Sequence, residues 1–368
     1  MERRFSPDYA MKTLHMILLS ARRALLATLA ISLSLPVLSQ SLSDLSFGDS
    51  GEFRAITWNL EWFPKNGQST LDSVATAILA LDADVYALQE ISDTAQFMDW
   101  AGTIDGYEGL HANGWFGGLT YLVKTATVEV DDLYEILSTS PFWSPLPRSP
   151  LMLEIHFDGQ PLVLVNNHFK CCGDGSLDLD DDGDEETRRW IASNLIKEAL
   201  DQDYAQIPVL LMGDLNDILT DPASDNVFQA FLDDPDHYSF ADMTLAQGPS
   251  SGWSYPNWPS HIDHILYNHY WDSPGADYTV LSIPVEDHLA GGWWAYDENM
   301  SDHRPVGIHG ALVLGLDEIH SAPLCASWSK RCIDATGRRV DCKQPQGLLF
   351  QQCATTSQYR KIMGGLAE

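Results

Sequence analysis

Short apolar runs that end in polar residues recur along most of the chain and alternate with two amphipathic segments. The runs are bounded by Gly, Pro, Asn or Asp and are rich in β-branched and aromatic residues, which predicts β-strands. The predicted strands span residues 53–62, 84–91, 117–124, 151–157, 161–170, 207–217, 261–268 and 303–314. The amphipathic segments 69–84 and 185–202 predict helices.

Turn residues organise these elements into one domain. Residues 158–160 separate two of the strands and predict a hairpin, whereas the loop 141–150 holds four prolines and is expected to be irregular. Strands interrupted by helices predict a layered α/β domain over residues 52–315, preceded by a polar linker at residues 40–51.

The first 39 residues have the pattern of a secretory signal peptide. Arg22 and Arg23 precede the apolar run 24–38, and Ser39 is a small residue at the expected cleavage point. Pro36 and the shortness of the run disfavour a transmembrane helix. We therefore expect a soluble, exported protein, either periplasmic or extracellular.

Export changes how the six cysteines are interpreted, because an even number in an oxidising compartment usually forms disulfides. Four of them lie in the predicted basic tail, residues 316–368: Cys325, Cys332, Cys342 and Cys353. We favour disulfides over a zinc knuckle there, and three pairings remain open. Cys171 and Cys172 are adjacent, and they form either a strained vicinal bridge or bridges to distant cysteines.

The net charge of −31 is concentrated in the middle of the chain. Residues 1–39 hold five Lys/Arg and two Asp/Glu, residues 320–368 hold seven and three, and the remainder holds nine and 47. Residues 40–319 are therefore at −38 and residues 320–368 at +4. Such acidity opposes long-range attraction to polyanions, so a nucleic-acid substrate would require local metal charge, the basic tail or a salty medium.

Polar residues at the strand ends form an ordered series that reads WNLEW, LQE, NNHF, GDLN, HIDHIL and SDH. Any one of these residues could simply satisfy a turn, but their repetition along one domain indicates a shared site. The series comprises Asn59, Glu90, Asn166, His168, Asp214, Asn216, Asp263, Asp302 and His303.

This ordered series resembles the endonuclease/exonuclease/phosphatase superfamily, which includes pancreatic-type deoxyribonucleases, apurinic-site endonucleases, inositol polyphosphate 5-phosphatases and neutral sphingomyelinases. The resemblance spans roughly residues 52–310. It implies a four-layered α/β sandwich, in which two β-sheets pack face to face between outer helices. It also implies a metal-dependent hydrolase that acts on phosphoester bonds.

An oxygen-rich set of side chains is the expected metal site, because a hard cation must neutralise a phosphate oxygen before water can attack. Glu90 is the expected principal ligand. The resemblance places Asn59 and Asp302 close to the same ion, directly or through water. We expect Mg²⁺, with Mn²⁺ or Ca²⁺ as alternatives.

The attacking water needs a proton acceptor and an orienting group, and the resemblance assigns these roles to Asp214 and Asn216. It also implies that Asp263 hydrogen-bonds His303, which fixes the ring and favours its charged form.

His168 matches the histidine that lies beside the leaving oxygen in the family. Asn166 is expected to be a phosphate or structural contact. Arg148 and Lys170 are further candidates for binding the substrate phosphate, and charge balance is their alternative role.

An acidic loop after the fifth predicted strand partly matches an EF-hand. Asp178, Asp180, Asp182 and Gly183 fit the first half of a calcium loop, but Arg189 stands at the twelfth position, where Glu is expected. We favour a solvated loop over a bound Ca²⁺.

We expect a secreted nuclease that hydrolyses DNA or RNA. The alternative is a lipid-headgroup or small-molecule phosphoesterase, because Trp293 and Trp294 could enter a lipid surface. A binding module without activity is disfavoured by the complete polar series. No obligate protein partner is predicted.

Overall fold

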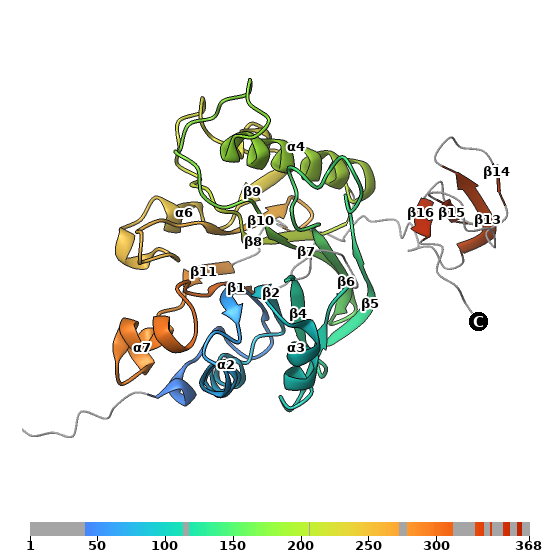
Figure 1. Cartoon of the computed structure of the whole chain (residues 1–368). Coiled ribbons are helices and arrows are strands. Elements are labelled where there is room, and N and C mark those ends of the chain that lie inside the picture. Colours follow the sequence, from blue (N-terminus) through green and yellow to red (C-terminus); the bar gives the residue numbers. More distant parts are fainter. Residues whose placement is uncertain are drawn as a thin grey trace, which may run out of the picture.

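Two mixed six-stranded sheets pack face to face between layers of helices (Figure 1). The computed structural model describes residues 41–112, 118–205, 207–271 and 278–311, and the strand segments 328–334, 339–340, 349–353 and 359–362. This arrangement confirms the predicted four-layered α/β sandwich. The predicted signal peptide lies outside the described residues. No helix in these described ranges is long and apolar enough to cross a membrane.

Both sheets follow one pattern of strand directions. The first sheet contains, in spatial order, β11 (Tyr278–Ser282), β12 (Val306–Gly310), β1 (Phe53–Phe63), β2 (Val85–Ile91), β4 (Thr120–Lys124) and β3 (Tyr107–Leu110). The second contains β5 (Val128–Glu135), β6 (Leu151–Phe157), β7 (Gln160–His168), β8 (Val209–Asp214), β10 (Asp263–Asn268) and β9 (Tyr238–Phe240). The central pairs β1–β2 and β7–β8 are parallel, and the flanking pairs are antiparallel.

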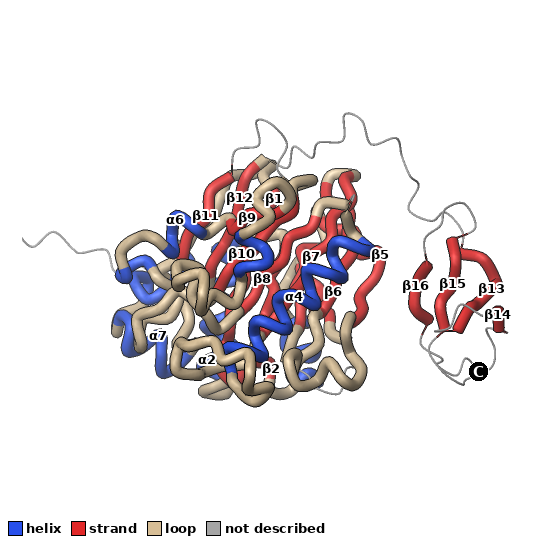
Figure 2. Tube along the Cα trace, turned by 90° about the horizontal axis from the view of Figure 1, so that it is seen from above, coloured by secondary structure: helices blue, strands red, loops and turns tan. Residues whose placement is uncertain are grey.

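Helices cover the outer face of each sheet (Figures 1 and 2). The parallel pairs are joined by crossover helices, as parallel strands require, namely α2 (Gln68–Leu81) and α4 (Glu185–Asp203). The first sheet is also covered by η1 (Leu42–Asp44), α3 (Thr94–Ala101), η3 (Val285–His288) and α7 (Gly292–Asn299), and the second by α5 (Gln229–Leu232). The short helices α6 (Met243–Ala246) and η2 (Ser250–Gly252) lie in the connection between β9 and β10.

The core consists of three apolar layers, one between the sheets and one between each sheet and its helices. Along β1, Phe53 and Ala55 pack between the sheets, whereas Ile56, Trp58 and Leu60 pack toward the helices. Strands buried on both faces read as nearly continuous apolar runs, which is why the sequence pattern located them.

The central strands and both long helices agree with the sequence prediction, whereas strands β3, β5, β9 and β11 were not predicted. All four lie at sheet edges, and β5 is also acidic, with a bulge between Val130 and Asp132. An edge strand has one partner and tolerates polar residues, so its apolar pattern is weak. Leu45 and Phe47, within the predicted linker, are buried against the first sheet's helical layer.

A separate four-stranded sheet lies in the C-terminal tail, in the order β14 (Arg339–Val340), β13 (Trp328–Asp334), β15 (Leu349–Cys353) and β16 (Tyr359–Ile362). The side chains of the four tail cysteines lie outside what is described, so their disulfides remain a prediction. Cys171 and Cys172 are free thiols whose Sγ atoms are 2.8 Å apart.

Candidate active site

Asp214, at the end of β8, lies at the centre of a group of polar side chains between the two sheets. Its Oδ2 accepts a hydrogen bond of 2.9 Å from Asn59 Nδ2 on β1. The same oxygen is 3.5 Å from Nε2 of His168, at the end of β7, and 3.9 Å from Nε2 of His303. Glu90 on β2 is 3.3 Å from Asn59 Nδ2 and 3.9 Å from His168 Nε2. Both sheets therefore contribute to one site, as the sequence series predicted.

The conformation of β8 at this point depends on a glycine. Gly213 has φ +151°, and a Cβ atom there would lie 2.0 Å from the carbonyl oxygen of Asn167 on the neighbouring strand. Any side chain would therefore separate β7 from β8 and move His168 away from Asp214.

His303 is held charged by the carboxylates around it. Its Nδ1 hydrogen-bonds Asp263 Oδ2 at 2.8 Å, and Asp263 is fully buried. Burial alone would lower the pKa of His303, but Asp263, Asp214 and Asp302 together raise it to about 10. The backbone carbonyl of His303 accepts hydrogen bonds from Trp58 Nε1 and the Tyr296 hydroxyl, which fix its position. The structure thus places Asp263 and His303 together, as the resemblance implied.

His168 has the opposite character. It is only 3% exposed, and burial, with Arg148 and His303 nearby, holds its pKa well below the ordinary value. Its Nδ1 is buried and has no hydrogen-bond partner among the described residues. The ring is therefore neutral, and the Asp214 carboxylate lies between one neutral and one charged imidazole.

Two acids of the site, Asp214 and Asp302, have raised pKa values because they are buried and lie near other carboxylates. Burial is the main cause at Asp214, whose pKa rises to about 7 although His303 opposes the shift. Burial and Glu61 likewise raise the pKa of Asp302 to about 6 against the opposing charge of His303. A divalent cation would relieve this crowding by favouring the ionised carboxylates.

The donors around Glu90 fit a hard divalent cation. The side chains of Glu90 and Asp302 are 19% and 20% exposed, so each still reaches solvent. Glu90 Oε2 accepts the backbone N–H of Trp62, and Glu61 accepts that of Asp302. A set of carboxylate oxygens suits Mg²⁺, Mn²⁺ or Ca²⁺ better than zinc.

Asn59 does not offer its carbonyl oxygen to this position. Its Oδ1 accepts the backbone N–H of Glu61 at 2.9 Å, and its Nδ2 is directed at Glu90 and Asp214. Of the two arrangements that the resemblance allowed, direct and water-mediated, only the indirect one agrees with this orientation. Asn59 also holds the two carboxylates together.

Of the two roles predicted for Asn166, a phosphate contact or a structural contact, its hydrogen bonds favour the structural one. This residue is fully buried, and its Nδ2 donates to the carbonyls of Leu88 and Thr120 at 3.0 and 2.9 Å. Its Oδ1 accepts from Gln89 Nε2 at 2.7 Å. Asn166 therefore joins the two sheets beneath the site and has no group left for substrate.

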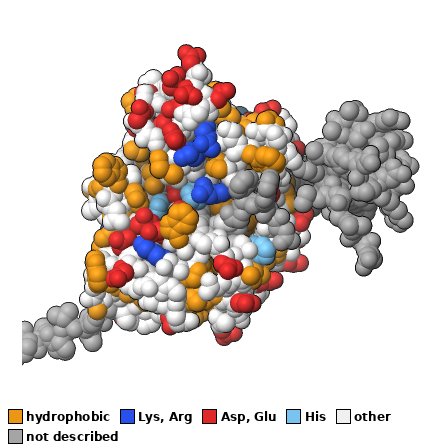
Figure 3. Space-filling model, viewed as in Figure 1, with side chains coloured by type: hydrophobic (Ala, Val, Ile, Leu, Met, Phe, Trp, Pro, Cys, Tyr) orange, Lys and Arg blue, Asp and Glu red, His pale blue; other side chains and the backbone are white. Residues whose placement is uncertain are grey.

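The remaining candidates lie at the rim. Asn216 has φ +54°, and its backbone N–H donates to Asp214 Oδ1 at 3.0 Å. Arg148 is close enough to His168 to influence its pKa. Lys170 is turned away, because its Nζ donates to the Cys171 carbonyl and lies 3.7 Å from Glu185. Figure 3 shows histidine atoms among basic, acidic and hydrophobic side chains near the middle of the face that it displays.

Two further residues, Glu61 and Tyr255, touch Asp302 and His303, contacts that the sequence did not predict. Glu61 accepts the backbone N–H of Asp302 and forms a short ion pair with Lys65. Tyr255 packs its ring against His303, with ring centroids 4.8 Å apart, and burial with Asp302 and Glu61 nearby raises its pKa to about 12. The Glu within WNLEW was a visible signal for the first, but the second comes from an irregular loop.

The comparisons with known proteins agree with this geometry. The model of the Endonuclease/Exonuclease/phosphatase family matches residues 56–303. A search of curated proteins finds no match. Among solved structures, D. rerio TDP2 complexed with single strand DNA product has a TM-score of 0.54 at 18% identity, covering 71% of this chain and 99% of that one.

A second similar structure is the human Nocturnin catalytic domain with bound sulfate anion. Its TM-score is 0.52 at 16% identity, covering 71% of this chain and 93% of that one. Identities this low establish the shared fold alone, whereas the family model covers about two thirds of the chain, including strands of both large sheets. The chain belongs to the Endonuclease/Exonuclease/phosphatase family.

Proposed function

We propose that the protein is an exported, divalent-metal-dependent phosphodiesterase that hydrolyses a nucleic-acid strand. One observation carries the proposal: Asp214 Oδ2 lies 3.5 and 3.9 Å from two buried histidines, one neutral and one charged. Titratable groups whose surroundings push their pKa values apart are suited to separate acid and base roles. Membership of a family of phosphoester hydrolases supports this reading.

Each residue of the site has a separate role in the proposed reaction. Asp214, with its raised pKa, accepts the proton of the attacking water, and Asn216 orients that water. His303 presents its charged ring to the phosphate and is held in place by Asp263. His168, on the other side of Asp214, presents a neutral ring that would hydrogen-bond the leaving oxygen, and the charged His303 is the ring able to supply that oxygen with a proton. Proton transfer of this kind contributes roughly 10²- to 10⁴-fold to the rate.

A divalent ion would be held by Glu90 and Asp302, with Asn59 hydrogen-bonding the surrounding carboxylates. When bound, it supplies positive charge to a non-bridging phosphate oxygen. Mg²⁺ is the first choice, with Mn²⁺ and Ca²⁺ as alternatives.

Nucleic acid is the proposed substrate class because the fold is shared with a TDP2 structure described as complexed with single strand DNA product. At a net charge of −31 the protein gains little from long-range attraction to phosphates. Base stacking on aromatic side chains is an alternative source of affinity. Trp62 and Trp258 are 69% and 79% exposed, Trp62 follows Glu61, and Trp258 lies in the same loop as Tyr255.

Parallel hydrolysis assays test the proposal. Single-stranded DNA, RNA, plasmid DNA and sphingomyelin vesicles are incubated with the wild type, in Mg²⁺ or in EDTA. Glu90→Gln is the variant expected to lose activity at limiting Mg²⁺, and Glu129→Gln, an exposed acid on β5, is the matched control. Metal-dependent cleavage of a nucleic acid that Glu90→Gln alone weakens at that Mg²⁺ concentration supports the function. Release of phosphocholine alone, or hydrolysis of no substrate, overturns it.

Export is tested separately by N-terminal sequencing of the protein recovered after bacterial expression. A mature chain outside the cytoplasm that begins near Gln40 is the expected result. An uncleaved chain retained in the cytoplasm contradicts export.

A further inference from the structure

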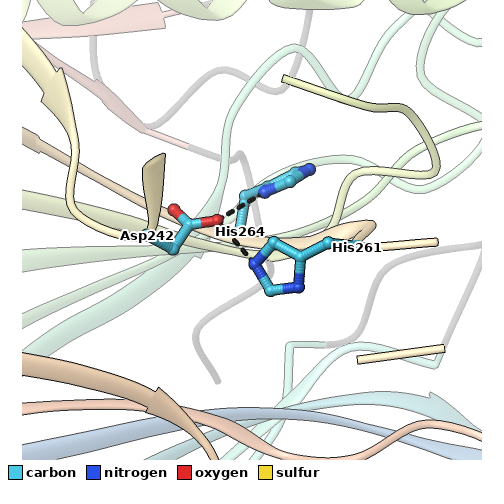
Figure 4. Close-up of side chains that lie close together, drawn as sticks. All are labelled: Asp242, His261 and His264. Carbon is cyan, nitrogen blue, oxygen red and sulfur yellow. Dashed lines mark hydrogen bonds and ion pairs between the residues drawn. The ribbon is translucent and has the colours of Figure 1, made fainter. Parts of the chain in front are cut away.

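A second cluster of titratable side chains lies outside the proposed active site. Asp242, His261 and His264 are 0%, 1% and 0% exposed and come from the α6 N-terminus, the turn before β10 and β10 itself. Asp242 Oδ2 hydrogen-bonds both imidazoles, His264 Nδ1 at 2.6 Å and His261 Nε2 at 2.9 Å (Figure 4).

The hydrogen-bond partners determine the protonation of each ring. Nδ1 of His264 faces Asp242, and its Nε2 faces the carbonyl oxygen of Asp217 at 2.8 Å. Both partners only accept, so both nitrogens must carry hydrogen and the ring is an imidazolium. His261 differs, because its Nδ1 accepts the backbone N–H of Ser254 at 3.4 Å and only its Nε2 donates.

A metal ion fits these contacts less well. Ligand atoms of a tetrahedral zinc ion lie about 3.3 Å apart, given bonds of about 2.0 Å, whereas the oxygen-nitrogen separations here are 2.6 and 2.9 Å. In addition, the donor facing His261 Nδ1 leaves the hydrogen on Nε2, where a metal ion would need a lone pair. The cluster is therefore a hydrogen-bonded ion pair.

The His264 ring of this pair contacts the loop that follows β8. Asp217, whose carbonyl receives the His264 hydrogen bond, comes directly after Asn216 and three residues after Asp214. A charge-assisted hydrogen bond to a buried carbonyl is stronger than a neutral one. Asp242 thus acts on this loop through His264.

The same loop is tied from its other side to the segment that follows His168. The Asp217 carboxylate accepts from Arg189 Nε at 2.7 Å, and Arg189 Nη1 donates to the carbonyls of Lys170 and Cys172 at 2.8 and 2.7 Å. Asp217 is therefore the shared anchor of the two loops that carry the histidine and the carboxylate of the site.

We propose that His264, itself held by Asp242, positions Asp214 and Asn216 by donating a hydrogen bond to the Asp217 carbonyl in the loop that follows β8. The predicted effect on kcat rests on the proposed function, whereas the role of the hydrogen bond from His264 to the Asp217 carbonyl in holding the loop does not. Asp242 and His264 are positioning residues, since they touch neither substrate nor reacting atoms.

Two neutral substitutions of the same residue separate positioning from mere loss of charge. The amide nitrogen of Gln can occupy the place of the imidazole Nε2, whereas that of Asn reaches only the place of Nδ1. His264→Gln therefore keeps the hydrogen bond to the Asp217 carbonyl, and His264→Asn loses it.

We expect His264→Gln to retain kcat within about threefold of the wild type, and His264→Asn to lower kcat about 10- to 100-fold with KM little changed, as a small misplacement of catalytic groups does. Equal kcat values for the two variants, with both folded by circular dichroism, overturn the proposal.

NMR spectra test the same proposal without requiring enzymatic activity. In the wild-type chain, ¹⁵N resonances should show both ring nitrogens of His264 protonated at pH 8, and a neutral ring there refutes the pair. The amide resonance of Asn216 should move in His264→Asn but not in His264→Gln. If the wild type hydrolyses no phosphodiester, the proposed function fails while these spectra still decide the positioning role. If a variant does not fold, the wild-type ¹⁵N spectrum still decides whether His264 carries both ring hydrogens.

Discussion

Asp263→Asn is the most informative change at the proposed active site. It keeps the shape of the side chain but removes the charge that lies 2.8 Å from His303 Nδ1. The elevation of the pKa of His303 from 6.5 to about 10 corresponds to roughly 5 kcal/mol in favour of the charged ring. Of the groups that raise this pKa, Asp263 is the foremost, so its loss removes the largest share.

The expected cost in rate follows from the role of such a carboxylate. A comparable substitution beside the histidine of serine proteases lowers kcat about 10⁴-fold, and general acid-base assistance as a whole is worth roughly 10²- to 10⁴-fold. We therefore expect kcat to fall at least about 100-fold. Because a raised pKa keeps His303 charged into the alkaline range, the alkaline limb of the rate profile should move to lower pH in the variant.

The same substitution has a separate effect on stability. Asp263 Oδ1 is buried and has no hydrogen-bond partner among the described residues. An amide nitrogen at that position would be an unpaired donor, which costs roughly 1–3 kcal/mol, or a melting temperature about 2–12 °C lower.

The assay is hydrolysis of a labelled oligonucleotide at saturating Mg²⁺ between pH 5 and pH 10, with thermal melting as the control for folding. A variant that is folded, within threefold of the wild-type kcat and unchanged in its pH profile would refute the role assigned to the Asp263–His303 pair.

Three further predictions follow from the site and the buried ion pair. Glu90→Gln should raise the Mg²⁺ concentration for half-maximal activity at least about tenfold, because a principal ligand is lost, and a metal titration with unchanged half-saturation would exclude Glu90 as a ligand. His168→Ala should lower kcat roughly 10²- to 10⁴-fold. Because burial keeps the pKa of His168 far below 6.5, the wild-type pH–rate profile should show no titration of this histidine between pH 6 and pH 8. A titration in that range that disappears in the variant would show that the His168 ring is not neutral. Asp242→Asn should destabilise the fold by roughly 3–5 kcal/mol, as breaking a buried pair does. Burial opposes both shifts in that pair, but the pKa of Asp242 is lowered from 3.8 and that of His264 is raised from 6.5. The stabilisation is therefore complete between these two values and declines as the pH falls through the folded pKa of Asp242 or rises through that of His264. A difference in melting temperature that does not vary between pH 2 and pH 10 would count against the pair.

The sequence located the catalytic strands because each one is an apolar run that ends in a polar residue. Glu90, His168 and Asp214 stand at or beside such ends, whereas Asp263 begins β10 and Asn59 lies within β1. The fold brings all five together. Strand ends are recognisable from local pattern, since the change from apolar to polar residues marks where the core stops.

The sequence did not predict how deep between the two sheets each polar residue lies. Asn166 and His168 are two residues apart and point to the same face of β7, yet only His168 lies at the level of Asp214. Asn166 is one step deeper, where Gln89 and two backbone carbonyls satisfy it. A polar residue on the inner face of a strand can contact either substrate or the opposite sheet. Which of the two it contacts depends on the distance between the sheets, and no local sequence pattern encodes that distance.

Loop residues were missed for a related reason. Tyr255 reaches His303 because the turn from Tyr255 to Ser260 folds back on itself and the Ser254 hydroxyl accepts the backbone N–H of Asp263. These contacts join residues that have no regular spacing in the chain, so the sequence predicts aromatic residues nearby but not which ring touches the histidine.

The repeated strand pattern of the two sheets has a consequence for how the protein acquires activity. Asn59 and Glu90 belong to one sheet, whereas His168 and Asp214 belong to the other, and the hydrogen bond from Asn59 to Asp214 crosses between them. Neither sheet holds a working set. A chain severed in the turn at Thr125–Thr127 would leave Asn59 and Glu90 on one fragment and the remaining residues, with β11 and β12 of the first sheet, on the other, so each fragment would be inert. Activity regained on mixing them would report both the completion of the first sheet and its docking on the second.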